Sequence, residues 1–301
     1  MVSAPSFLVS GNASIDEYYL VDRIPAADEA QEAKDFFAKL GGAATNVAVA
    51  LSRLKARVTF AGVVGSDEYG DLIVRYLSEE GAATHCVVRS SKPTGKVVVI
   101  LDNAGRRAMV AVRGANTDLK PGFIDADAMF KGVSHAHLSS TKPDYTRWVL
   151  AEAKKRGLST SYDPGMAIAS RGLEYVRDVL GLVDVLFVNA REYDALGGEA
   201  LEKEYRGLLV VKEGEHGSRI PGLGLQVPAF RVSAVDTTGA GDSFNAAFLV
   251  AWKLGLPYEK CLAIANAAGA IKSTKLGAQS SPTLSELNRF LESRGHEPLV
   301  F

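Results

Sequence analysis

The chain has 301 residues, of which 47% are hydrophobic and 23% are charged, as in an ordinary soluble globular protein. Its net charge of -1 gives no electrostatic reason to expect nucleic acid or an anionic membrane as a partner. The apolar runs are too short to span a bilayer and the N-terminus lacks signal-peptide features, so a cytoplasmic protein is expected.

Short β-rich runs alternate with helical patterns, which predicts βαβ units and a mostly parallel sheet. Strands are expected over 7–11, 58–64, 133–140, 158–163, 184–189 and 207–211. Helices are expected between them over 44–54, 67–81, 144–157, 172–181 and 189–197, and in the C-terminal third over 241–255, 257–274 and 283–294.

Two stretches interrupt this alternation. Residues 16–24 and 33–40, and then 94–112, have strand character without intervening helices. The second stretch contains DNAG at 102–105 between two β-branched runs, which predicts a hairpin. Such strands fit poorly between crossover helices, so we expect a small inserted β-subdomain that acts as a lid.

The cysteines and histidines indicate no metal or thiol chemistry. Cys86 and Cys261 are far apart and lack CxxC spacing, so inert buried thiols in a reducing compartment are expected. His135 and His137 alternate on a predicted strand, but no third ligand accompanies them.

The segment DTTGAGDSF, residues 236–244, places two glycines and an aspartate at the start of a predicted helix. Free amides and the helix dipole suit an anion there, and glycine lets the backbone approach it closely. Asp242 fits an N-cap, a metal ligand or a general base, and the short string leaves these three open. The chain also lacks a GxGxxG fingerprint after its first strand, which counts against a nucleotide-dependent oxidoreductase.

The whole string resembles the C-terminal signature of the ribokinase-like, phosphofructokinase-B type carbohydrate kinases. Other segments match that family in order: GNASID, LGGAATNVAVALSRLKA, RGANTDL, NAREYDAL, VVKEGEHGS and KLGAQSSP. The resemblance covers roughly residues 7–292. It implies one ribokinase-like α/β domain over 1–301, built as a three-layer α/β/α sandwich with a mostly parallel central sheet. The small β-sheet lid would be formed by inserted segments at about 14–39 and 94–113.

By this resemblance, Asp242 is the general base that deprotonates the acceptor hydroxyl, and the amides of Gly239, Ala240 and Gly241 form the anion hole. Asn189 and Glu192 organise Mg²⁺ through its waters, although their spacing alone favours a capping box. The nucleotide is expected to lie against Lys212, Gly214, Gly217, Asn266 and Gly277. From the residues alone, Lys212 also fits a solvated strand end, and Asn266 also fits a core helix.

The acceptor site implied by the resemblance contains Asp16, Gly42 and Asn46, with Gly41 and Gly42 as a hinge for closure. A carboxylate and an amide at such positions can form hydrogen bonds with neighbouring hydroxyl groups of a sugar. From the residues alone, Asp16 also fits a carboxylate on a surface loop. Arg113 precedes the G-A-N segment, where it would either clamp a carboxylate or phosphate or carry charge at the lid edge.

Asp236 matches a family position that holds a monovalent cation, together with backbone carbonyls near Ala270, Lys275 and Gly277 and with Ser281. An acidic residue that stabilises the anion-hole loop is an equal alternative. K⁺ is therefore an optional activator in this interpretation.

The expected function is ATP- and Mg²⁺-dependent phosphorylation of a pentose, hexose or polyol. The alternatives are a nucleoside kinase, a 2-keto-3-deoxygluconate kinase and a catalytically silent sugar-sensing protein. Arg113 favours the keto-acid kinase, but the tyrosine pair that precedes it in those enzymes is VAVR here. Open strand edges and an apolar face on a small lid predict a homodimer joined through the lids.

Overall fold

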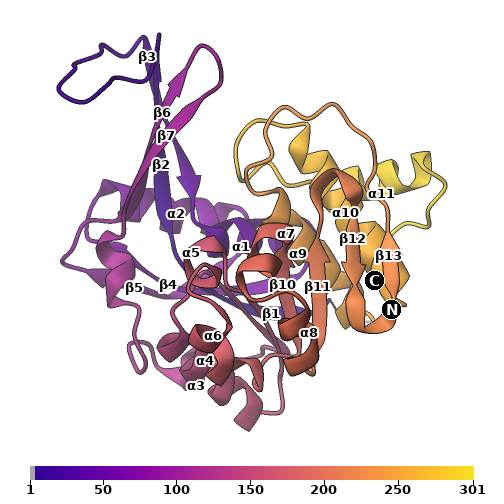
Figure 1. Ribbon diagram of the computed structural model, residues 1–301. Coiled ribbons are helices and arrows are strands. Elements are labelled where there is room, and N and C mark those ends of the chain that lie inside the picture. Colours follow the sequence, from indigo (N-terminus) through magenta and orange to yellow (C-terminus); the bar gives the residue numbers. More distant parts are fainter. Residues whose placement is uncertain (1–3) are drawn as a thin grey trace.

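The computed structural model describes residues 4–301, and its larger sheet has nine strands in the order β13-β12-β11-β10-β9-β8-β1-β4-β5 (Figure 1). The strands are β1 (Ser6–Gly11), β4 (Arg57–Gly65), β5 (Ala83–Ser90), β8 (His135–Ser139), β9 (Ser159–Asp163), β10 (Val185–Asn189), β11 (Leu208–Lys212), β12 (Ser218–Ile220) and β13 (Leu225–Val227). From β5 to β11 all neighbours are parallel, whereas β12 and β13 are antiparallel. The predicted mostly parallel sheet is confirmed.

Helices cover both faces of this sheet, as the alternation of side chains along the strands requires. In β1, Phe7 and Val9 face one apolar core, while Leu8 between them faces the other. The first core is covered by α1 (Ala43–Arg53), α2 (Glu68–Glu79), α9 (Ala240–Lys253), α10 (Tyr258–Ser273) and α11 (Leu284–Ser293). The second is covered by α3 (Ala126–Phe130), α4 (Pro143–Lys155), α5 (Met166–Ala169), α6 (Leu173–Leu180), α7 (Ala190–Ala195) and α8 (Glu199–Glu204). The predicted three-layer α/β/α architecture is therefore confirmed.

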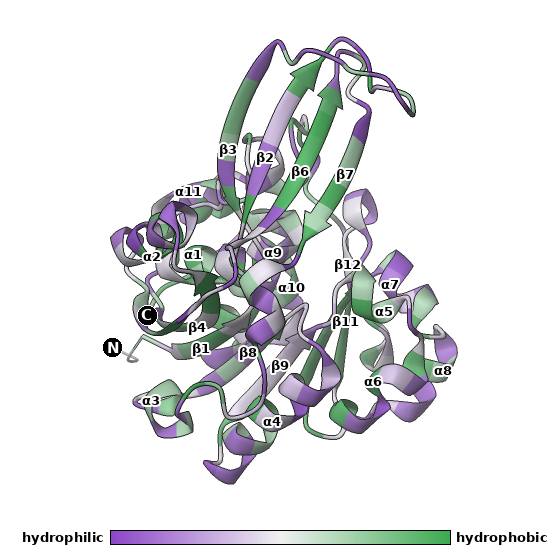
Figure 2. Ribbon diagram, turned by 90° about the vertical axis from the view of Figure 1, so that its left-hand side faces the viewer, coloured by the Kyte–Doolittle hydropathy of each residue, from purple (hydrophilic) through white to green (hydrophobic). Residues whose placement is uncertain are grey.

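A separate four-stranded sheet, called here the lid sheet, projects from the main body (Figures 1 and 2). Its order is β3-β2-β6-β7, from β2 (Ser14–Val21), β3 (Asp35–Gly41), β6 (Gly95–Asp102) and β7 (Arg107–Val112). The DNAG turn joins β6 to β7 as predicted, and the Asp102 carboxylate accepts from the amides of Ala104 and Arg106. Asn116 in the 3₁₀ turn η1 (Gly114–Asp118) bonds both backbone groups of Ala13, which fastens the base of the lid sheet.

Several short elements have no counterpart among the predicted ones. Strands β12 and β13 have three residues each, too few to display a period, and the 3₁₀ turns η2 (Gly214–His216) and η3 (Pro221–Leu223) lie on either side of β12. Edge strand β5 mixes exposed and buried positions. Within residues 4–301, no helix combines the length and the apolar character that crossing a membrane would require.

The carboxyl ends of β1, β9, β10 and β11 meet at one edge of the large sheet, the usual ligand location in open α/β sheets. The chain leaves β1 at this edge and enters β2 of the lid sheet three residues later. The motifs singled out in the sequence therefore converge here.

Candidate active site

The glycine turn before α9 is fixed by contacts that only glycine allows. Gly239 is left-handed, with φ 79°, and a Cβ there would lie 2.2 Å from the carbonyl oxygen of Ala278. The Ala240 amide donates to Thr237 O at 3.1 Å, so it belongs to the turn itself. Among residues 4–301 no acceptor takes the amides of Gly239 and Gly241. In this structure the Ala240 amide is therefore occupied within the turn, and the anion hole over residues 239–241 stays a prediction.

Asp242, in the first turn of α9, meets Asn46 of α1 across the site. Asn46 Nδ2 donates to Asp242 Oδ2 at 2.8 Å, while the buried Asn46 Oδ1 has no partner in the described part of the chain. Desolvation raises the pKa of Asp242 to about 7; the Asn46 hydrogen bond opposes this rise, and the Asp163 charge adds to it. A carboxyl group with this pKa can exchange a proton near neutral pH.

Asp16 lies over the turn that leads into α1. A Cβ on Gly41 would lie 2.2 Å from Asp16 Oδ1, and one on Gly42, with φ 96°, would lie 2.4 Å from Asn12 O. Burial raises the pKa of Asp16 to about 6. Gly42 is the N-cap of α1, so this turn leads from Asp16 directly to Asn46. The predicted acceptor residues therefore lie close together in space: Asp16 on β2 packs against the turn that carries Gly42, and Asn46 follows in α1.

Arg113 does not join this group. Its side chain is exposed at the start of η1 and has no polar partner among residues 4–301. It is also not among the residues that line the two cavities described below. In this structure Arg113 is a charged residue at the edge of the lid sheet, the second of the two predicted alternatives, and no contact supports its prediction as a substrate clamp.

Lys212, at the end of β11, forms a buried cluster that the sequence analysis did not assemble. Its ammonium donates to Asp163 Oδ2 at 2.7 Å and to Asn245 Oδ1 at 3.1 Å, and Asn245 Nδ2 donates to Asp163 Oδ2 at 2.7 Å. Burial works to raise the pKa of Asp163, yet the Lys212 charge and these bonds hold it below the ordinary value. A Cβ on Gly241 would lie 3.4 Å from Lys212 Nζ, so this ammonium lies beside the glycine turn.

Asn189 and Glu192 form the capping box that their spacing favours. Asn189 Oδ1 accepts from the Glu192 amide at 2.9 Å, and Glu192 Oε2 accepts from the Asn189 amide at 2.8 Å. Burial, with a contribution from the Asp163 charge, raises the pKa of Glu192 to about 7. Within residues 4–301, no three or more His, Cys, Asp or Glu side chains are grouped to hold a metal ion. The residues present therefore fit Mg²⁺ only as an ion bound mainly by phosphate and water, a common mode for this ion.

A cavity of about 780 Å³ lies beside the glycine turn, and Thr237, Ala240 and Gly241 form part of its wall. Its lining includes the predicted residues Lys212, Gly214, Gly217 and Asn266, together with Phe230, Ala240, Gly241 and Phe244. Asn266 Nδ2 donates to the carbonyls of Val227 and Pro228 and so ties α10 to the end of β13. Gly277 is not part of this lining, and its amide donates to Asp236 Oδ2 at 2.9 Å; its nucleotide contact stays a prediction.

A second cavity, of about 430 Å³, lies between the lid sheet and the glycine turn. It is lined by Tyr18, Phe37, Lys39, Leu101, Gly105, Arg107, Leu276 and residues 234–237. Lys39 and Arg107 give it two cationic side chains, while Asp236 gives it one anionic side chain.

Asp236 and the buried Lys272 join the two loops beneath the glycine turn. The Asp236 carboxylate accepts from the amides of Thr238 at 3.0 Å and Gly277 at 2.9 Å. Lys272 Nζ donates to Asp236 O at 2.7 Å and to Lys275 O at 3.1 Å. This is the arrangement expected if Asp236 stabilises the anion-hole loop.

Three residues of this region, Asp163, Asn245 and Lys272, were not predicted as site residues. Asn245 follows Asp242 by one helical turn on α9, and that spacing was a usable signal. Asp163 ends the predicted strand β9, which is separated from the strand of Lys212, β11, by β10 alone. Lys272 gives no local signal, because the closer of its two acceptors, Asp236 O, lies on a loop distant in sequence.

Comparisons with known proteins agree with this geometry. The sequence profile described as the pfkB family of carbohydrate kinases matches residues 5–284. An ATP-dependent ribose-1-phosphate kinase of Halopiger xanaduensis is 33% identical over 95% of this chain and 98% of its own, and a Bacillus subtilis ribokinase is 31% identical over 94% and 98%. The structure of Arabidopsis thaliana ribokinase in complex with ribose and ATP superimposes with a TM-score of 0.87 at 29% identity, over 96% of this chain and 99% of that one.

These matches extend over nearly the whole of each protein and confirm the predicted sugar-kinase activity. A likeness to the Methanocaldococcus jannaschii nucleoside kinase, at 23% identity and a TM-score of 0.82, concerns the fold alone. The chain belongs to the pfkB family of carbohydrate kinases.

Proposed function

We propose that this kinase transfers the γ-phosphate of ATP to a hydroxyl of a small sugar, with Asp242 as the general base. The observation that carries the proposal is the Asn46–Asp242 pair beside the free amides of Gly239 and Gly241. Asp242 accepts the hydroxyl proton, and Asn46 Oδ1, which lacks a partner, accepts a hydrogen bond from the sugar. The two glycine amides stabilise negative charge on the migrating phosphoryl group.

The nucleotide would occupy the 780 Å³ cavity, whose size is within the usual range for ligand sites. Lys212 would reach the phosphates at the turn, because its ammonium already lies next to Gly241. Mg²⁺, when bound with the nucleotide, would neutralise phosphate charge. Glu192 and Asn189 would hold its waters, and Asp163 would keep Lys212 in place.

The acceptor would lie under the lid sheet, against Asp16 and Asn46. The Gly41–Gly42 turn is placed to serve as the hinge of closure, which would exclude water from the phosphoryl group. The aromatic side chains of the lid sheet, which could otherwise stack on a nucleobase, pack on one another in pairs: Tyr18 stacks on Phe37 at 4.8 Å and Tyr19 packs on Phe36 at 5.0 Å. A free sugar therefore remains the first candidate, ahead of a nucleoside.

A sugar phosphate is a second candidate acceptor, favoured by one observation. Lys39 and Arg107 line the 430 Å³ cavity beside the acceptor residues, and their charges suit a phosphate group. The ribose-1-phosphate kinase relative is consistent with this candidate.

Two further features belong to the proposal. The outer strands β3 and β7 of the lid sheet are unpaired among residues 4–301, and Phe36, Met109 and Val110 are exposed there, which supports a homodimer through the lids. Cys86 and Cys261 are free and buried, which fits a cytoplasmic location.

A coupled ATP assay with ribose, ribose 1-phosphate, fructose, 2-keto-3-deoxygluconate, adenosine and cytidine tests the proposal. We expect turnover with ribose or ribose 1-phosphate to exceed turnover with either nucleoside. No ATP-dependent turnover with any acceptor, despite sugar binding, would instead support the silent sensor. Light scattering that gave a monomer at assay concentrations would refute the dimer.

A further inference from the structure

The Lys272 ammonium is a fully buried charge whose partners are all acceptors. It donates to the carbonyls of Asp236 at 2.7 Å and Lys275 at 3.1 Å, and it lies 3.8 Å from Asp236 Oδ2. The side chain has no exposed surface. A buried lysine is costly unless its surroundings compensate the charge, so this site is built for a cation.

The two loops joined by this ammonium form the floor of the glycine turn. Asp236 begins the segment that reaches Gly239, and Lys275 begins the segment that reaches Ala278. These segments also meet where the Gly277 amide donates to Asp236 Oδ2, and where Gly239 leaves no room for a Cβ beside Ala278 O. A shift of either loop would therefore move the Gly239 amide.

Both of these residues, Asp236 and Lys275, belong to the set for which the sequence resemblance implied a monovalent cation. A K⁺ ion does not fit there, because the lysine nitrogen already lies at hydrogen-bond distance from the Asp236 and Lys275 carbonyls. We infer that Lys272 is a positioning residue whose ammonium takes the place of K⁺ beneath the anion hole, so that this kinase works without a monovalent activator. The inference rests on the proposed phosphoryl transfer.

The nearby charges act on Lys272 in both directions. Burial lowers the pKa of Lys272 and the Lys39 charge adds to this fall, whereas Asp236 and Asp242 favour the ammonium form. In turn, the Lys272 charge favours the ionised form of Asp242. The ammonium thus both positions the turn and supports the carboxylate that takes the proton.

The first test varies the cation supplied to the wild-type enzyme. Turnover is measured at constant ionic strength with KCl, NaCl or tetramethylammonium chloride as the only monovalent salt. The three rates should agree within about twofold, a difference in activation free energy below about 0.4 kcal/mol. A severalfold activation by K⁺ would overturn the inference. Absence of turnover in all three salts would instead count against the proposed function.

The second test removes the tethered ammonium. Lys272→Ala should lower kcat in tetramethylammonium by about tenfold to a hundredfold, less than the loss of a direct anion-hole donor. Adding NH₄⁺ or K⁺ should restore much of that activity, because the small ion can enter the space left between the carbonyls. Two results would contradict the inference: a Lys272→Ala variant that turns over as fast as the wild type without an added cation, or a folded Lys272→Ala variant that no cation restores.

Lys253→Ala is the matched control. This lysine also donates to a backbone carbonyl, that of Ser134, but at the opposite edge of the sheet. Its loss should lower the melting temperature and leave turnover independent of the added cation. If Lys272→Ala does not fold, the wild-type cation series alone still decides the question.

Discussion

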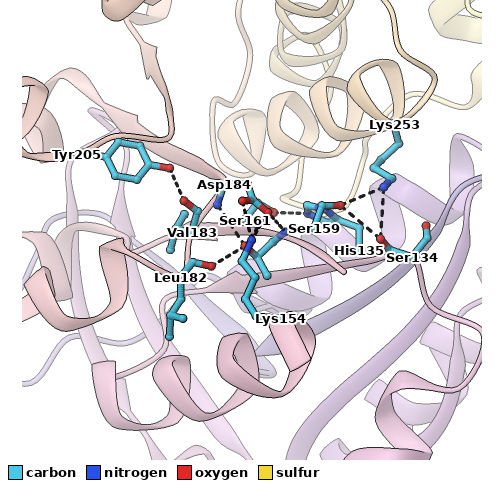
Figure 3. Close-up of polar contacts among 11 residues, drawn as sticks. Ser134, His135, Lys154, Ser159, Ser161, Leu182, Val183, Asp184, Tyr205 and Lys253 are labelled. Carbon is cyan, nitrogen blue, oxygen red and sulfur yellow. Dashed lines mark hydrogen bonds and ion pairs between the residues drawn. The ribbon is translucent and has the colours of Figure 1, made fainter. Parts of the chain in front are cut away.

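The two edges of the large sheet carry polar clusters of opposite character. At the amino edge of β8 to β10, Lys154 donates to both Asp184 oxygens at 2.6 Å, and both ring nitrogens of His135 meet serine hydroxyls at 2.7 and 2.9 Å (Figure 3). Lys253 reaches this cluster from α9 and donates to Ser159 Oγ at 3.0 Å (Figure 3). Every side chain in the cluster has a partner, and burial holds the pKa of His135 well below its usual value.

At the carboxyl edge the polar groups are left incomplete. Asn46 Oδ1 is buried without a partner in the described chain, and the pKa of both Asp242 and Glu192 is raised to about 7 by burial. Incomplete hydrogen bonding and raised carboxyl pKa values reduce stability, and a protein retains them where a ligand completes them. The saturated edge therefore stabilises the sheet, and the incomplete edge has the character expected of the proposed binding and reaction site.

The largest contrast between the two edges should come from their aspartates. Asp242→Asn should lower kcat by about 10²–10⁴-fold, the usual contribution of a general base. Asp184→Asn should leave kcat near the wild-type value and lower the stability by about 1–3 kcal/mol, because the amide keeps only one of the two acceptor oxygens used by Lys154 and Thr160 and loses the negative charge. The measurements are steady-state kinetics and thermal unfolding, and equal kinetic effects of the two variants would remove the contrast.

Whereas Asp184→Asn should lower the stability of the protein, Asp242→Asn should raise it. Since its folded pKa is raised from the ordinary 3.8 to about 7, the stability that Asp242 contributes is fully present below about pH 4 and is lost progressively as the pH rises to about 7. Asp242→Asn should therefore be more stable than the wild type at pH 8, by about 1–2 kcal/mol, with a smaller gain at pH 5. A lower melting temperature at pH 8 would contradict this account of the carboxylate.

The next contrast is between Lys212 at the carboxyl edge and Lys154 at the amino edge, whose loss should have different effects on stability and on ATP binding. Lys212→Met leaves Asp163 and Asn245 without their donor, so it should cost about 3–5 kcal/mol of stability and raise the KM for ATP. Lys154→Met, with a third of its side chain exposed, should cost less and leave that KM unchanged. Unchanged ATP affinity in a folded Lys212→Met would show that the two lysines are equivalent.

A smaller effect is expected at the acceptor. Asp16→Asn should raise the KM for the sugar about tenfold with little change in kcat, because Asp16 binds hydroxyls in the ground and transition states alike. The comparison is made in initial-rate assays against an exposed lid carboxylate, Asp22→Asn, whose KM should match the wild type. A fall in kcat as large as that of Asp242→Asn would instead place Asp16 in the chemical step.

The smallest effect is a shift in the pH profile. The proposed mechanism requires deprotonated Asp242 as the base, so it predicts that kcat/KM falls below about pH 7. The Asn46 hydrogen bond lowers the pKa of Asp242, so Asn46→Ala should move this acid limb to higher pH. A limb that stays in place would show that another group controls the rate.

Much of the fold could be predicted, because it depends on local periodicity. Strand β10 alternates Val185 and Phe187 toward one core with Leu186 and Val188 toward the other, a pattern visible in the sequence. The short strands β12 and β13 could not be found, since their pairing depends on tertiary contacts rather than on their own residues.

The site was predictable where one motif holds the chemistry. DTTGAGDSF indicated the glycine turn and Asp242, but it could not show that the Ala240 amide is consumed within the turn. Lys272 was not predictable at all, because its acceptors come from two loops that meet only in the folded chain. The contacts of Asn189 and Glu192, in contrast, could be predicted, because their spacing of three residues alone indicates the capping box that the structure contains.

The most direct test of the account is a single-turnover experiment on Asp242→Asn, with sugar and nucleotide affinities measured by calorimetry on the same sample. We predict affinities within about threefold of the wild type, together with a phosphoryl-transfer rate lowered at least about a hundredfold. A transfer rate within tenfold of the wild type at saturating substrates would contradict the assignment of Asp242 as the base.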